Sequence, residues 1–97
     1  MRFEWHESKN RRNRSKHGIS FELAMLAFDD PHSMSWLDRI EESEERWHTL
    51  GLVGGIVVLL VVYTFREESG NEVIRIISAR KASPQERRVY EEGIGVI

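Results

Sequence analysis

The sequence contains no cysteine, which excludes a disulfide framework and any metal site built from thiolates. It also lacks a long apolar run. The longest, residues 56–63, is far shorter than the roughly 20 residues that a membrane-spanning helix needs. Residues 1–18 are polar and charged, so they contain no apolar segment typical of a secretory signal. These absences predict a cytoplasmic protein that does not bind membranes.

Sequence patterns typical of common catalytic and cofactor sites are absent as well. There is no glycine-rich phosphate loop, no nucleophile elbow and no carboxylate pair at a catalytic spacing. The histidines, His6, His17, His32 and His48, do not stand at a spacing typical of zinc ligands. We therefore expect no metal and no cofactor.

Charge is present in quantity, but it is unevenly distributed along the chain. Residues 1–18 hold six basic and two acidic side chains, whereas residues 19–45 hold eight acidic side chains and a single arginine. A net charge of -2 conceals this division. The uneven distribution indicates one surface for an anionic partner such as a nucleic acid and another for a basic partner, although solvated charged faces would leave the same pattern.

Local patterns predict the secondary structure. The expected elements are a strand at 3–5, helices at 8–17 and 21–28, strands from 33, at 45–52, 56–66 and 73–81, and a final helix at 84–90. Gly18 is expected to end the first helix and Ser20 to begin the second, while Ser83 and Glu86 form a capping box. Residues 54–55 are expected to be a bulge or hinge, and residues 68–71 a hairpin turn.

This order of elements predicts a single α+β domain spanning residues 1–97. Its sheet is expected to be antiparallel with four to five strands, with two N-terminal helices and one C-terminal helix packed against it. The strand at 56–66 is apolar on both faces, so we place it in the centre of the sheet.

Basic side chains gather on the last two long strands and the final helix. They are Arg66, Arg75, Arg80, Lys81, Arg87 and Arg88, with Tyr90 beside them. Strand alternation predicts that Arg75 and Lys81 share one face and that Arg80 lies on the other. Guanidinium groups at these positions suit phosphate binding, but nearby glutamates could pair with any of them instead.

Two further residues have both a functional and a structural interpretation. His17, next to Lys16, could act as a general base, or it could interact favourably with the C-terminal end of its helix. Trp47 could stack on a nucleic-acid base, or it could pack against the core.

Three stretches resemble signature motifs of the BrnT family of toxins. They are residues 13–22, which contain Asn13-x-x-Lys16-His17-Gly18 and follow Trp5 and Lys9; residues 75–82, Arg-Ile-Ile-Ser-Ala-Arg-Lys-Ala; and Glu86-Arg87-x-x-Tyr90. Between them Asp30-Pro31, Glu45-Arg46, Gly51 and the apolar run ending in Arg66 follow in the expected order. One departure is His6, where the family commonly has aspartate; Ser8 is expected to cap the helix in its place.

The resemblance implies a RelE-like fold, ribonuclease activity that arrests growth, and neutralisation by a small BrnA-like antitoxin with a ribbon-helix-helix DNA-binding half. It also implies a toxin–antitoxin heterotetramer that reaches DNA only through the antitoxin. By position, it implies catalytic roles for Arg66, Arg80, Lys81 and Tyr90.

These considerations combine in one hypothesis, a metal-independent endoribonuclease that forms a 2′,3′-cyclic phosphate. In it Arg66 and Arg80 stabilise charge on the phosphoryl group, Lys16 and Lys81 hold the RNA backbone, and His17 or Lys81 takes the proton of the 2′-hydroxyl. Tyr90 would stack on a base or support the leaving group. Arg12, Arg75 and Trp47 would add RNA contacts.

The same basic surface fits two other hypotheses. One is a non-catalytic RNA- or ribosome-binding module, or an inactive toxin retained as an antitoxin partner. The other is direct DNA binding, which is disfavoured because the sequence lacks a helix-turn-helix or ribbon pattern.

Overall fold

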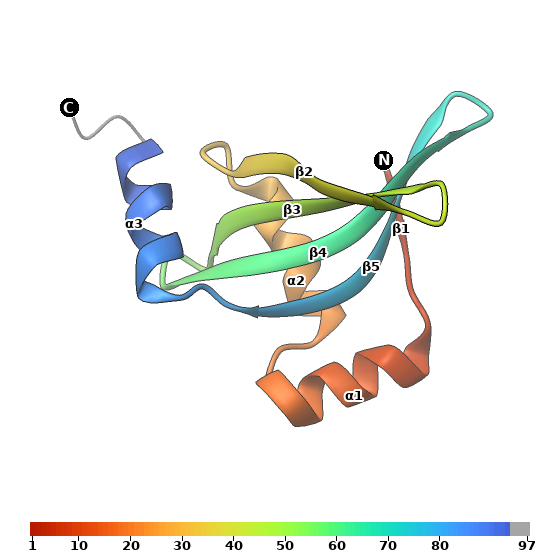
Figure 1. Cartoon of the computed structure of the whole chain (residues 1–97). Helices are drawn as coiled ribbons and strands as arrows, with labels where there is room; N and C mark the ends of the chain where they lie inside the picture. Colours follow the sequence, from red (N-terminus) through yellow and green to blue (C-terminus); the bar gives the residue numbers. More distant parts are fainter. Residues whose placement is uncertain (94–97) are drawn as a thin grey trace.

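The computed structural model describes residues 1–93 as a five-stranded mixed sheet with helices on both faces (Figure 1). The elements in chain order are β1 Arg2–Glu4, α1 Glu7–His17, α2 Phe21–Met25, the 3₁₀ helix η1 Leu26–Asp29, β2 Met34–Glu41, β3 Glu44–Val53, β4 Val57–Glu68, β5 Asn71–Lys81 and α3 Pro84–Gly93. The strand order is β1-β5-β4-β3-β2. None of the helices described is long and apolar enough to cross a membrane.

The α+β class is confirmed, but the prediction of a wholly antiparallel sheet is wrong at β1. This strand pairs parallel with β5, whereas the other neighbouring strands pair antiparallel. The strands β2 to β5 follow one another through hairpins, which make antiparallel neighbours. β1 is the first strand of the chain and β5 is the last, so no hairpin connects them and none fixes their relative direction.

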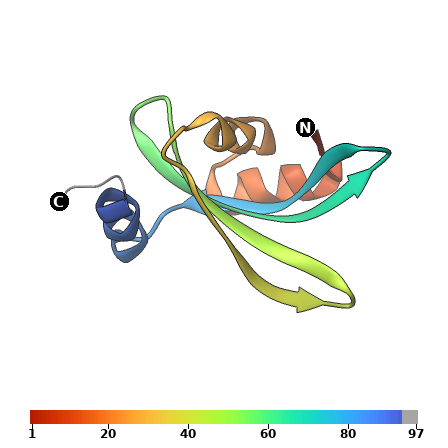
Figure 2. The same ribbon diagram turned by 90° about the horizontal axis from the view of Figure 1, so that it is seen from above.

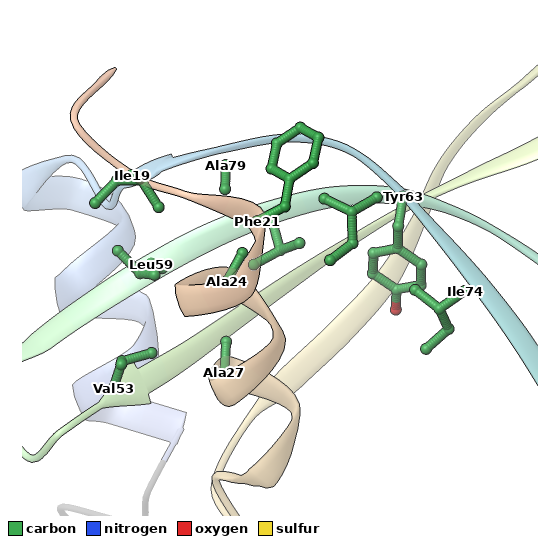
Figure 3. Close-up of a cluster of buried hydrophobic side chains, with 11 residues drawn as sticks. Ile19, Phe21, Ala24, Ala27, Val53, Leu59, Tyr63, Ile74 and Ala79 are labelled. Carbon is green, nitrogen blue, oxygen red and sulfur yellow. The ribbon is translucent and has the colours of Figure 1, made fainter. Parts of the chain in front are cut away.

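Strand β4 lies in the centre of the sheet and buries side chains on both faces, as predicted. Leu59, Val61 and Tyr63 belong to the core that α2 and η1 cover (Figure 3). The alternate residues Val58 and Leu60 belong to a smaller core with Tyr90 of α3. In Figure 2, α3 lies on the other side of the sheet from α1 and α2.

Helix α1 contains no apolar side chain, and two buried asparagines hold it in place. Asn10 Oδ1 accepts a hydrogen bond from the backbone N–H of Phe21 at 2.8 Å. Asn13 Nδ2 donates to the carbonyl oxygen of Ala79 at 2.7 Å, and its Oδ1 accepts from the N–H of the same residue. The Asn13 amide thus pairs with the β5 edge as a neighbouring strand would, beyond the point where β1 ends.

Most local signals at the ends of the helices are confirmed. Gly18 ends α1 with φ 73°, and Ser20 Oγ accepts from the N–H of Leu23 at 3.0 Å. Ser83 and Glu86 form the reciprocal capping box.

Three local predictions are corrected. Ser8 lies inside α1, and His6 occupies the N-cap without a side-chain hydrogen bond, because the helix begins one residue earlier than expected. The helix expected at 21–28 narrows to a 3₁₀ helix after Met25. Gly54 and Gly55, both with positive φ, form the β3–β4 hairpin turn, since the strands on either side pair up to Val53 and Val57.

Candidate nucleic-acid interface

Strand β5 carries a bulge that determines which of its side chains share a face. Tyr63 pairs with Ile76 and Val62 pairs with Ser78, so Ile77 is an extra residue. The predicted sharing of a face by Arg75 and Lys81 is therefore wrong. The register places Arg75, Ser78 and Arg80 on the α3 side of the sheet, and Lys81 on the side of α1 and α2.

Arg80 forms a two-pronged ion pair with Glu86 at the start of α3. Its Nη1 and Nη2 donate to the Glu86 carboxylate at 2.8 and 3.0 Å, and Nη1 also donates to the carbonyl oxygen of Lys81. Hydrogen bonding to Arg80, assisted by the backbone N–H of Ser83, lowers the pKa of Glu86 to about 2. The Arg80 side chain is 42% exposed, and its Nε–H and one Nη2–H stay available to a ligand.

Arg66 and Arg75 are held by carboxylates elsewhere on the sheet. Arg66 binds both oxygens of Glu4, at 3.0 and 3.2 Å, and also Glu68. Arg75 donates to both oxygens of Glu44. Arg66 stands six residues along β4 from the partner of Arg80, roughly 20 Å away. The structure therefore does not bring Arg66 and Arg80 into one site.

Tyr90 lies in the core between α3 and the sheet, which contradicts the prediction that it stacks on a base. It is 3% exposed, and its hydroxyl donates to Asp30 Oδ2 at 2.5 Å. Burial, together with the hydrogen bond to Asp30, raises the pKa of Tyr90 to about 12. Burial alone would raise the pKa of Asp30, but hydrogen bonds from the Leu52 N–H, Tyr90 and the His32 N–H outweigh it and lower that pKa. Asp30 and Tyr90 thus join α3 to β3.

Trp47 also departs from its predicted role. It packs against the core on the α1–α2 side of the sheet, and its indole N–H donates to Glu45 at 3.2 Å. Arg75 and Arg80 lie on the opposite face. Trp47 therefore cannot share a ligand surface with them.

Helix α1 carries five of the eight lysine and arginine side chains that form no ion pair within residues 1–93; the others are Lys81, Arg87 and Arg88. None of its five, Lys9, Arg11, Arg12, Arg14 and Lys16, forms an ion pair within residues 1–93. The arginines on the strands, in contrast, all contact carboxylates. Positive charge available to a polyanion is thus concentrated on α1.

One face of α1 forms a pocket with the edge of β5. Its volume is about 250 Å³, and it is lined by Lys9, Arg12, Asn13, Lys16, His17, Ile77 and Ser78. We call it the α1–β5 pocket. It brings together Arg12, Lys16 and His17, three of the predicted site residues. His17 is partly buried, and the three cationic side chains around it are exposed.

Sequence reasoning missed Lys9, Asn13 and Ser78 as parts of this pocket. The first two could have been found, because Lys9, Arg12, Asn13 and Lys16 stand at i, i+3, i+4 and i+7 and so share a helix face. Ser78 could not, because its position depends on the Ile77 bulge.

A second polar group that the sequence did not single out lies on the α3 side of the sheet, which we call the open face. His48 meets Trp36 edge-on, with ring centroids 5.5 Å apart, and its Nε2 lies 3.7 Å from Asp38. Arg46, two residues away on the same face, has a buried Nε without a hydrogen-bond partner in the described chain. The sequence could have indicated this cluster, because Arg46 and His48 are two residues apart on β3 and therefore share a face of the sheet.

The chemistry of the α1–β5 pocket suits a phosphate-containing ligand. Three cationic side chains can contact phosphate oxygens, and the imidazole of His17 lies beside them. Across residues 1–93, no group of three histidine, aspartate or glutamate side chains could hold a metal ion.

Comparisons with known proteins show the family to which the chain belongs. The chain matches, over residues 5–86, the family model described as the ribonuclease toxin BrnT of type II toxin–antitoxin systems. Its fold is similar to the crystal structure of the Brucella abortus ribonuclease toxin BrnT, with a TM-score of 0.65 and 24% identity over 86% of this chain and 97% of that one. No curated protein sequence matches significantly. Because the family model spans most of the chain, the protein belongs to the BrnT family of ribonuclease toxins of type II toxin–antitoxin systems.

Proposed function

We propose that the protein is a metal-independent endoribonuclease that binds the RNA backbone in the α1–β5 pocket. The observation that carries the proposal is the set of unpaired cations on α1 lining one pocket with His17. Arg12, Lys16 and Lys9 hold the phosphates on either side of the scissile bond. Arg80 lies on β5 two residues beyond Ser78, about 7 Å along the strand, with donors free to contact the same backbone.

The proposed reaction needs only the RNA and side chains of this chain. His17 takes the proton from the ribose 2′-hydroxyl, with Lys81 as the alternative acceptor, and the 2′-oxygen attacks the adjacent phosphorus. The bond from phosphorus to the 5′-oxygen breaks, the conjugate acid returns a proton to that oxygen, and a 2′,3′-cyclic phosphate remains. Arg80, oriented by Glu86, stabilises the charge that builds on the phosphoryl oxygens.

The biological setting belongs to the same proposal. Cleavage of cytoplasmic RNA would arrest growth, and a BrnA-like ribbon-helix-helix antitoxin would neutralise the toxin in a heterotetramer that represses its own promoter. The RelE-like classification of the fold is part of this proposal too. The alternative is a catalytically inactive RNA-binding member of the family, since the same cations would hold RNA without a proton acceptor.

Cleavage of labelled RNA in excess EDTA tests the proposal. We expect the wild type to produce fragments that end in a 2′,3′-cyclic phosphate. The double variant Arg12→Ala/Lys16→Ala should lose about tenfold or more in kcat/KM, since it removes two phosphate contacts.

The matched control is Arg11→Ala/Arg14→Ala. It removes the same charge from the same helix, but from side chains that line a different surface with Ser15 and Gly18. We expect a loss of about threefold or less, from weaker long-range attraction alone. Equal losses in the two double variants would contradict the assigned pocket. Binding without cleavage would favour the inactive member, and cleavage abolished by EDTA would contradict the metal-free reaction.

Tyr90→Phe is expected to separate a structural role from a catalytic one. The change removes the hydroxyl that donates to Asp30 and leaves the ring in its core position. We expect a loss of about 1–2 kcal/mol in the free energy of unfolding, measured in urea, and an unchanged kcat. A tenfold lower kcat in a fully folded Tyr90→Phe variant would show that Tyr90 has a catalytic role.

A further inference from the structure

The sheet face under α2 and η1 extends well beyond these short helices. Past η1, the apolar side chains of Trp47, Tyr63 and Phe65, with Ser35, line a groove of about 230 Å³. The ring of Tyr63 meets Phe28 of η1 with a centroid distance of 5.0 Å, which marks the edge of the covered region. On the far side of that edge, all the residues that line the groove belong to strands of the sheet, and none belongs to a helix.

The apolar surface continues from this groove onto the edge strand β2. Leu37 pairs with Trp47 and Ile40 pairs with Glu45, so both side chains lie on the same side of the sheet as the groove. They are three residues apart, and the bulge at Asp38 supplies the extra residue that puts them on the same face. Leu37 is 42% exposed and Ile40 is 64% exposed. We call these two residues, with Trp47, Tyr63 and Phe65, the apolar face.

Acidic side chains without ion partners border the apolar face. Glu45 lies on β3, on the same side of the sheet as the apolar face. Glu67 on β4 and Glu72 on β5 are opposite each other in the strand register, two residues beyond Phe65. Within residues 1–93 none of the three forms an ion pair, although most other glutamates of the sheet do. Their negative charge is therefore free to attract a cationic partner.

We infer that the apolar face docks a segment of the antitoxin that carries apolar side chains flanked by lysine or arginine; the inference rests on the proposed toxin–antitoxin function. Exposed apolar surface of this kind favours a protein partner. The acidic border attracts basic side chains and repels RNA phosphates. A second copy of this chain would have to present α3, where Arg87 and Arg88 precede the exposed Val89, and the test below distinguishes that case by the oligomeric state.

The apolar face also lies apart from the α1–β5 pocket. β2 and β3 stand at the opposite edge of the sheet from β5 and α1. Substitutions on the apolar face therefore test docking without touching the residues proposed to cleave RNA.

Titration calorimetry with the purified cognate antitoxin, sought in the reading frame next to this gene, tests the inference. Leu37→Asp and Ile40→Asp should each raise Kd about tenfold or more, because an aspartate replaces a desolvated apolar contact. Val89→Asp is the matched control: Val89, on α3, is 43% exposed and lies in a different pocket, with Trp36 and Leu50. It should change Kd by about threefold or less. Far-UV circular dichroism and melting curves confirm that each variant folds.

The inference would be overturned by no binding by the wild type, by an unchanged Kd in Leu37→Asp and Ile40→Asp, or by an equal loss in Val89→Asp. A wild-type dimer that Leu37→Asp dissociates, with antitoxin binding intact, would also overturn it by making this face a self-interface. RNA cleavage without antitoxin is measured in parallel. If the wild type binds antitoxin at this face but cuts no RNA, the ribonuclease proposal fails and the docking inference stands.

Discussion

Replacing His17 with alanine is expected to lower kcat for RNA cleavage by about 10²–10⁴-fold, the usual contribution of a positioned general base. His17 is the imidazole in the pocket that the unpaired cations of α1 line, beside Ser78 of β5. KM should change little, because Arg12 and Lys16 still bind the backbone. Steady-state cleavage of a short labelled RNA measures kcat and KM of the wild type and the variant.

His48→Ala is the control for this prediction. His48 is also a partly buried histidine, but it lies on the open face of the sheet between Trp36 and Asp38. We expect its loss to lower kcat by about threefold or less. If His48→Ala abolished cleavage and His17→Ala did not, the proton acceptor would lie on the open face. If neither did, while Lys81→Ala abolished cleavage, the alternative acceptor would be established.

The parts of the fold that depend on neighbouring residues could be predicted from the sequence. The cap at Ser20, the end of α1 at Gly18 and the Ser83–Glu86 box each involve residues at most four apart. The central position of β4 followed from its apolar composition alone. The direction of β1 could not be predicted in this way, because it depends on a pairing between Phe3 and Ile74 across most of the chain.

The β5 face assignment failed for a physical reason as well. A bulge adds one residue to a strand and reverses the parity of everything beyond it. Ile77 is an ordinary β-branched residue, and nothing in its neighbours marks it as the extra one. The bulge places Arg75 on the face of Arg80, with Lys81 on the opposite face, whereas the prediction had placed Arg75 with Lys81. It also hid Ser78, which lines the α1–β5 pocket.

The motifs of the sequence identified important residues more reliably than they identified roles. Arg80 of the second motif and Glu86 of the third form one ion pair, and Tyr90 of the third binds Asp30. Asn13 of the first motif fastens α1 to the β5 edge. These motif residues therefore attach α1 and α3 to the sheet. Which arginine finds a carboxylate depends on the register of the strands, which the spacing of charges along the chain does not reveal.

Gly51 is the position where a single methyl group is expected to cost the most stability. It is buried on β3 opposite Leu59, where the backbone of η1 lies directly against it. A Cβ added there would collide with the carbonyl oxygen of Ala27 and would stand 2.8 Å from its Cβ. Since Ala27 is wholly buried and backbone atoms are involved, the contact cannot be relieved by a side-chain rotation.

We expect Gly51→Ala to lower the free energy of unfolding by about 3 kcal/mol or more, which is large overpacking for a buried site. For a domain of this size that corresponds to a fall in Tm of roughly 12 °C or more. The control is Gly54→Ala, where a Cβ meets nothing within 4 Å and the cost comes only from φ +64°. Its expected loss is about 1 kcal/mol. A Gly51→Ala variant as stable as Gly54→Ala would show that η1 can move off β3. Because the apolar face begins where η1 ends, such movement would also change the surface on which the antitoxin is inferred to dock.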